Sequence, residues 1–194
     1  MTTLNFPAWF DWMEQAFEGQ SLHTTPKDPG GATAFGWTYG TWEGFAKLHG
    51  LDPSFEHFAA MQRDDFKTPS RLAFWNAVKA DQLPAGVDVI WCDFQFGSYH
   101  ATEVLQGLIG VPADNAVGNV TINKAWSFNN KAKLLDDMTA ARKAYYQTLT
   151  AYEDFGRGWD RRADECMALA YGICKLSVPA PVVAANQVTT GDGT

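Results

Sequence analysis

Residues 87–109 read VDVIWCDFQFGSYHATEVLQGLI and carry the strongest helical pattern of apolar residues in the chain. Apolar side chains recur here at spacings of three and four, which places them on one face of a helix. The positions on this face are Val87, Ile90, Trp91, Phe94, Ala101, Val104, Leu105 and Leu108. We therefore predict a central core helix, in which Gly97 can introduce a kink.

Helical signals continue toward the N-terminus. Residues 5–17 place an apolar stripe on one face, with Asn5 as the cap, Pro7 in the first turn and Gly19 as the stop after Glu18. Three shorter helices are predicted to follow. They run from Thr41 to Gly50 with Trp42, Phe45 and Leu48 inward, from Ser54 with Phe55, Phe58 and Met61, and from Pro69 with Leu72, Trp75 and Val78 inward.

Two helices are predicted toward the C-terminus. Asn130 caps the first, which extends through Tyr152, and the second covers residues 160–174 after a break at residues 156–159. Residues 20–40 are rich in Thr, Pro and Gly and predict a structured loop or a small hairpin. Residues 177–194 lack periodicity and are expected to form a flexible tail. The chain is thus expected to be mainly α, with one domain over residues 1–176.

Composition narrows the functional classes. The 194 residues carry a net charge of −7, with a pI near 5.0, which argues against nucleic-acid binding. The sequence has no run of 18 apolar residues, so no membrane-spanning helix is predicted. The N-terminus lacks the pattern of a signal peptide. The three cysteines, Cys92, Cys166 and Cys174, make no disulfide framework and are expected to be reduced thiols.

Motifs for metal, nucleotide or serine chemistry are missing from the sequence. The four histidines show no metal-ligand spacing, so we expect no metal and no cofactor. There is neither a glycine-rich phosphate loop nor a Gly-x-Ser-x-Gly elbow. Cys92 falls on an apolar helical face, where core packing is the better interpretation than catalysis.

Glu18, Asp28 and Thr33 form the densest cluster of groups suited to catalysis. Glu18 is expected at a helix C-terminus beside aromatic residues, where the helix dipole and desolvation would raise the pKa of its carboxyl group. A protonated carboxyl group is what a general acid needs to cleave a glycosidic bond, and Asp28 would complete a carboxylate pair. Thr33 could orient the attacking water. From spacing alone, an ordinary helix end and an ordinary Asp-Pro-Gly turn explain the cluster better than catalysis does.

Aromatic residues follow this cluster directly. Trp37, Tyr39 and Trp42 could bind substrate, because flat rings stack on the C–H faces of sugars. For any single ring, packing in the core is the better interpretation.

At this point the sequence resembles glycoside hydrolase family 108, the phage and bacterial N-acetylmuramidases of lysozyme-like fold. The likeness is carried by EG at residues 18–19 and DPGGATAFGWT at residues 28–38, against a family signature of EGGY and then DPGGxTxxGIT. Later blocks agree in order: LPAGVD at 83–88, DF at 93–94, LQGLIGV at 105–111, residues 114–121, Arg142, residues 145–146, residues 158–159 and Arg162. The resemblance covers about residues 6–175.

The resemblance assigns roles to particular residues. The family's catalytic glutamate falls on Glu18, and Asp28 and Thr33 match its loop motif, as in other phage lysozymes that invert the anomeric centre. Gln20 and Ser21 replace a Gly and a Tyr of the signature. Asn115 stands where the family has Gly and can adopt the same left-handed backbone.

The function that follows is a peptidoglycan hydrolase that cleaves the β-1,4 bond between N-acetylmuramic acid and N-acetylglucosamine. About residues 6–82 would form the catalytic part, and about 83–176 a predicted peptidoglycan-binding part. A phage endolysin of this kind would be made in the cytoplasm and act in the periplasm or cell wall after release through a holin. The alternatives are a non-catalytic peptidoglycan-binding or scaffold module, motivated by Gln20 and Ser21, and a lytic transglycosylase.

Overall fold

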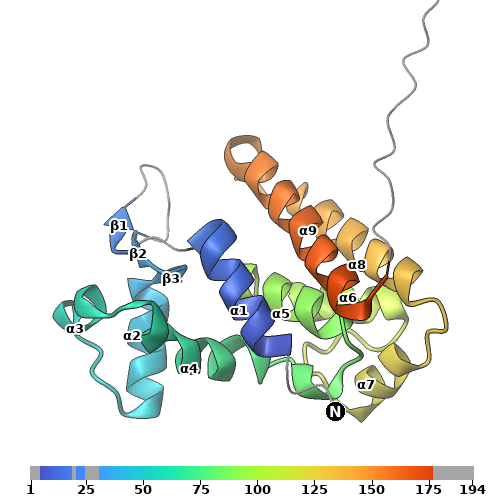
Figure 1. Ribbon diagram of the computed structural model, residues 1–194, viewed down its shortest axis with the longest axis horizontal. Helices are drawn as coiled ribbons and strands as arrows, with labels where there is room; N and C mark the ends of the chain where they lie inside the picture. The colour runs from blue at the N-terminus through green and yellow to red at the C-terminus, as the bar shows by residue number, and fades with distance from the viewer. Residues whose placement is uncertain (1–4, 19–20, 25–30, 177–194) are drawn as a thin grey trace, which may run out of the picture.

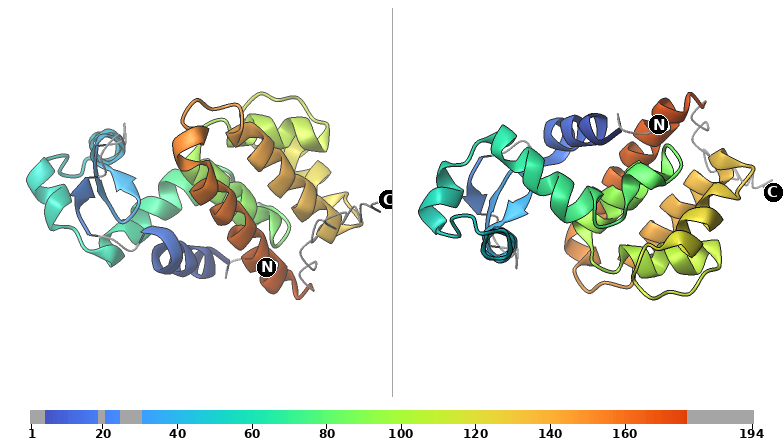
Figure 2. Two further views of the ribbon diagram at one scale, coloured as in Figure 1. Left: turned by 90° about the horizontal axis from the view of Figure 1, so that it is seen from above. Right: turned by 90° about the horizontal axis from the view of Figure 1, so that it is seen from below.

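The computed structural model describes residues 5–18, 21–24 and 31–176, which form two lobes (Figures 1 and 2). The small lobe holds an antiparallel sheet and two helices: β1 (His23–Thr24), β2 (Ala32–Ala34), β3 (Trp37–Thr38), α2 (Tyr39–His49) and α3 (Phe55–Ala60). The large lobe is helical: α5 (Val87–Gly97), α6 (Ala101–Ile109), α7 (Asn119–Trp126), α8 (Lys131–Tyr146) and α9 (Tyr152–Cys174).

Two further segments lie between these lobes. α4 (Lys67–Ser70) continues as a π-helical segment, Arg71–Trp75, that leads from the small lobe to the large one (Figure 1). α1 (Asn5–Met13) packs against α5 and continues as a π-helical turn, Glu14–Glu18, that ends at the small lobe. Short 3-10 turns occupy Arg63–Phe66 and Ala80–Gln82. The mainly α class is thus confirmed, and so is a small sheet within residues 20–40.

Local side-chain chemistry explains where several helices begin and end. The Ser54 hydroxyl accepts a hydrogen bond from His57 N (3.2 Å), and the Asn130 amide oxygen accepts one from Lys133 N (3.0 Å), which confirms both predicted caps. Gly50 ends α2 with φ 66°, a left-handed conformation that glycine adopts without strain. The predicted cap Thr41 was wrong. Thr38 caps α2 instead, with its hydroxyl accepting from Thr41 N (3.2 Å).

The predicted helix over residues 87–109 is two helices, not one kinked helix. The break falls at residues 98–100, where Ser98 is extended (φ −161°, ψ 128°). Its hydroxyl accepts from His100 N (3.2 Å) and donates to the hydroxyl of Tyr145 on α8 (3.1 Å). These bonds offer Ser98 an alternative to the helix, so the chain turns here and α6 starts at a new angle.

The predicted boundary between the last two helices was also wrong. α8 ends at Tyr146, and α9 begins at Tyr152 and passes through the glycines that were expected to break it. A Cβ atom on Gly156 would lie 2.6 Å from the ring of Tyr152, so this glycine makes room for the ring one turn earlier. The hydroxyl of Tyr152 donates to Asp160 Oδ2 (2.7 Å), which fastens the ring along the helix.

Three leucines that were expected to point inward are exposed. Leu48 is 81% exposed, Leu72 is 41% exposed and Leu108 is 37% exposed. In the small lobe, six aromatic rings already fill the interior, and each contacts at least one of the others. They are Trp37, Trp42, Phe45, Phe58, Phe66 and Phe74. The pattern of apolar residues therefore located the helices but did not separate core from surface at every position.

An ion cluster in the large-lobe core fixes α1 in place. Asp93 on α5 is fully buried, and its oxygens lie 2.8 Å from the guanidinium groups of Arg142 on α8 and Arg162 on α9. Burial alone would raise the pKa of Asp93, but the two guanidinium groups hold it well below its usual value. Trp9 on α1 donates its indole N–H to Asp93 Oδ1 (3.1 Å). The helix that leads to Glu18 is therefore bound to α5 at the residue that also binds α8 and α9.

The N-terminal end of α1 has a second anchor. Asn5 is the first residue of the helix rather than its cap, and its side-chain amide donates to Asp88 Oδ2 (2.7 Å) on α5. The expected stop at Gly19 and the expected tail over residues 177–194 lie outside the described residues.

Candidate active site between the two lobes

Glu18 is the last residue of the π-helical turn that follows α1. Such turns insert an extra residue into a helix and are frequent at functional sites. The backbone of Glu18 therefore lies at the end of the helix that points toward the small lobe (Figure 1). The Glu18 side chain and the whole of Asp28 lie outside the described residues, so their separation stays a prediction.

Thr33 lies in the middle strand of the sheet. It pairs with His23 on β1 and with Thr38 on β3. Its hydroxyl donates to the carbonyl of Gly31 (3.3 Å). A two-residue turn at Phe35 and Gly36 joins β2 to β3, and both residues have positive φ, 47° and 76°. Phe35 tolerates this conformation because its buried ring packs on Phe66, with 5.7 Å between the centroids. The turn brings Thr38 opposite Thr33.

A hollow of about 120 Å³ lies between the lobes, and we call it the inter-lobe hollow. From the small lobe it is lined by residues 36–38 and Thr41, and from the other side by Phe74 and residues 96–99. Phe96 is one of its lining residues. The ring of Phe96 packs edge-on against Phe74 (4.7 Å between centroids) and Trp9 (6.0 Å). Three elements therefore meet at Phe96: α1, α5 and the π-helical segment that follows α4.

Tyr99 is an exposed aromatic residue at the edge of this hollow, and sequence reasoning missed it. Its side chain is 68% exposed, although its backbone is held by the side chain of Asn115, which donates to Tyr99 O (3.3 Å). Asn115 adopts the predicted left-handed conformation, with φ 58°. The sequence pattern placed Tyr99 inside a continuous helix, whereas in the structure it lies in the break at residues 98–100 and is exposed.

The three aromatic residues that were expected to bind substrate lie mostly inside the small lobe. Trp37 is 1% exposed and donates to the Ser70 hydroxyl (3.0 Å), and Trp42 is 2% exposed and donates to Asp52 O (3.2 Å). Tyr39 is half-buried, and its hydroxyl donates to Pro53 O (3.1 Å). Most of the surface of these three rings is therefore packed in the core of the small lobe. Trp37 and Trp42 also reach hollows with an edge.

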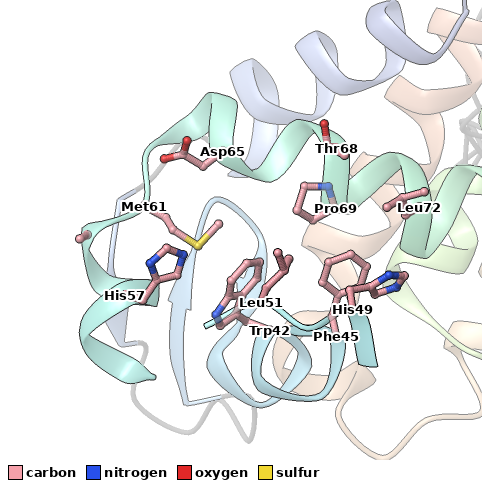
Figure 3. Close-up of a pocket in the computed structure, with 11 residues that line it drawn as sticks. Trp42, Phe45, His49, Leu51, His57, Met61, Asp65, Thr68, Pro69 and Leu72 are labelled. Carbon is pink, nitrogen blue, oxygen red and sulfur yellow. The ribbon is translucent and has the colours of Figure 1, made fainter. Parts of the chain in front are cut away.

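A larger cavity of about 570 Å³ lies within the small lobe (Figure 3), and we call it the α2 groove. α2, α3 and α4 surround it, and Trp42, Met61 and Pro69 point toward its interior. A third hollow of about 350 Å³, the middle hollow, lies between the α2 groove and the inter-lobe hollow and shares lining residues with both.

Other chemistries find little support in the residues that the structure describes. They contain no group of three or more histidine, cysteine or carboxylate side chains arranged to bind a metal. Across the same residues, no helix combines the length and apolarity that crossing a membrane requires. Cys92, Cys166 and Cys174 are free thiols, as predicted. Burial raises the pKa of Cys92 well above its usual value, which makes it a poor nucleophile.

Comparisons with known proteins agree with this picture. Residues 13–98 match the family model described as Glycosyl hydrolase 108. A solved structure, titled "Structure of Brucella abortus SagA", is similar over 88% of this chain and 98% of that chain, with 28% sequence identity and a TM-score of 0.76. No curated protein sequence matches the chain.

The fold and the match together define a glycoside hydrolase of mainly α, lysozyme-like architecture. Residues 13–98 are similar to glycoside hydrolase family 108. This segment contains Glu18, the sheet, the small lobe and α5, which are the elements around the inter-lobe hollow.

Proposed function

We propose that the chain is an N-acetylmuramidase that cleaves the β-1,4 bond between N-acetylmuramic acid and N-acetylglucosamine in peptidoglycan. The observation that carries the proposal is the position of Glu18. It ends a helical segment that is anchored in the large lobe and points toward the small lobe, within the residues that match the family model. The negative end of a helix dipole disfavours an ionised carboxylate, so a carboxyl group there tends to stay protonated and can serve as a general acid.

In this proposal Glu18 protonates the glycosidic oxygen while the leaving sugar departs. Asp28 acts as the general base for a water molecule, and Thr33 orients that water, which inverts the anomeric centre. The position of Thr33 supports this role. Thr33 pairs with Thr38 on β3, and Thr38 lines the inter-lobe hollow. No metal or cofactor takes part in these steps.

Substrate binding would use both lobes. The proposed peptidoglycan-binding part, about residues 83–176, contributes Phe96 and Tyr99 to the inter-lobe hollow, while the catalytic part, about residues 6–82, contributes Thr38 and Thr41. Tyr99 is the exposed ring best suited to stack on a sugar, since Trp37 is almost wholly buried. The net charge of −7 disfavours long-range attraction to an anionic cell wall, so binding rests on stacking and hydrogen bonds.

The proposed setting is a phage endolysin. Such a protein would be made in the bacterial cytoplasm, leave it through a holin and act on the cell wall. Its direct partner is the glycan strand.

Mass spectrometry of digested peptidoglycan tests this function. The proposal expects muropeptides with reducing N-acetylmuramic acid ends. Anhydro-muramoyl ends would identify a lytic transglycosylase instead. A chain that sediments with purified sacculi and releases nothing would be a non-catalytic binding module. Reducing ends on N-acetylglucosamine would overturn the assigned bond.

A further inference from the structure

The three hollows adjoin one another along α2, because neighbouring hollows share lining residues. The inter-lobe hollow and the middle hollow share Trp37, Thr41, Phe74 and Tyr99. The middle hollow and the α2 groove share Phe45, His49 and Leu72. A ligand that occupied all three hollows would follow a path along α2 from Thr41, near its start, to His49 at its end.

The chemistry changes along this path. The α2 groove is mainly apolar, and Leu51 and Leu72 at its mouth are 46% and 41% exposed. A contiguous exposed apolar surface of this kind is typical of a binding site. The polar side chains on its walls include two imidazoles, His49 and His57. Asp65, the carboxylate on the same wall, is engaged, because its Oδ2 accepts from Gln62 N (2.8 Å) as part of a helix cap.

We propose that the α2 groove binds the stem peptide of peptidoglycan while the glycan strand occupies the inter-lobe hollow. This inference rests on the proposed function. Sugars need many hydrogen-bonding partners, and the groove offers few. A stem peptide carries methyl and methylene groups that suit apolar walls, and carboxylates that can accept hydrogen bonds from His49 and His57.

The dimensions of the path agree with a peptide of this kind. Eight residues of helix separate Thr41 from His49, which corresponds to about 12 Å along α2. A stem peptide of four or five residues spans roughly 13–17 Å when extended. Because the peptide is bonded to the muramic acid residue, a sugar bound beside Thr41 would bring its own peptide into the groove.

The test compares two substrates and two variants. The substrates are glycan strands that carry stem peptides and strands from which an amidase has removed them. The groove variant is Leu51→Asn with Leu72→Asn, and the control is Leu108→Asn, an exposed leucine on α6 in the other lobe. Thermal unfolding of each variant checks that the fold is intact.

The wild type should prefer strands that carry peptides. In the groove variant, kcat/KM on these strands should fall about tenfold or more, the effect of losing apolar contacts in a pocket. Activity on denuded strands should be unchanged, and Leu108→Asn should leave the ratio of the two values as in the wild type. An equal loss on both substrates would mean that the groove binds sugar, and no loss on either would mean that it binds no part of the substrate. Both outcomes overturn the inference. A wild type that cleaves neither substrate would instead refute the proposed function.

Discussion

Thr33 on β2 lies directly opposite Thr38 on β3 in the antiparallel sheet. Thr38 caps α2 and also lines the inter-lobe hollow. The strand that carries Thr33 therefore pairs with a residue that contacts both the helix and the proposed binding site. The turn at Phe35 and Gly36 sets this register. A change at Thr33 therefore acts close to the proposed chemistry without altering the core.

Thr33→Val should lower the rate of peptidoglycan hydrolysis by roughly 10²-fold, since the attacking water loses its orienting partner. Valine keeps the β-branched shape that suits a strand, so the melting temperature should stay close to that of the wild type. Thr24→Val, on exposed β1 of the same sheet, is the matched control and should keep full activity. Full activity in Thr33→Val would remove Thr33 from the mechanism.

Asp93→Asn should destabilise the protein by about 3–5 kcal/mol, because it leaves the guanidinium groups of Arg142 and Arg162 buried without a counter-charge. Denaturant unfolding measures this change. The control is Asp137→Asn, which removes an exposed ion pair with Lys133 (2.6 Å) on α8 and should cost about 0–1 kcal/mol. Similar small costs for both variants would show that the buried cluster does not hold the four helices together.

Asp88 should give the stability of the protein a distinct pH dependence. Burial raises the pKa of Asp88 to about 6, above the value of about 3.9 expected in the unfolded chain. The folded state therefore binds this proton more tightly. The resulting stabilisation, about 3 kcal/mol, is fully present below pH of about 4 and is lost as the pH rises through about 6.

Unfolding in denaturant at several pH values measures this effect. In Asp88→Asn, the contribution to the slope between pH of about 4 and 6 should disappear, whatever the variant's overall stability. An identical pH dependence in wild type and variant would contradict the assignment.

Gly86→Ala should destabilise the fold by about 1–3 kcal/mol. Gly86 has φ +85°, and a Cβ atom there would lie 2.7 Å from Cys174 Sγ and 3.2 Å from Ala170 O on α9. Gly107→Ala, inside α6 with nothing within 4 Å of the added atom, should instead stabilise by about 0.5–1 kcal/mol. Thermal melts of the pair measure the difference, and a shift in the same direction for both would refute this explanation.

Local signals in the sequence predicted much of the fold. Ser54 and Asn130 cap helices as expected, since a cap depends on contacts within three residues along the chain. Long-range contacts determine features of the fold that local signals did not predict. The hydroxyl of Ser98 bonds to Tyr145, 47 residues away, and this contact accompanies the break in the expected central helix.

The candidate site was only partly accessible to sequence reasoning. Glu18 and Thr33 stood out because of the loop between them, and the family match covers both. Tyr99 and the α2 groove were missed, because they depend on the arrangement of the lobes. Leu72 shows the same limit: its helical spacing predicted a core position, yet it lies exposed at the mouth of the groove.

The most direct test of the central claim is digestion of purified peptidoglycan by wild type and Glu18→Gln, with the products read by mass spectrometry. We expect the wild type to release muropeptides with reducing muramic acid ends, and Glu18→Gln to be slower by about 10²–10⁴-fold while unfolding at the same temperature. Glu153→Gln, at an exposed position in the first turn of α9, should match the wild type. Hydrolysis by Glu18→Gln at the wild-type rate would contradict the account.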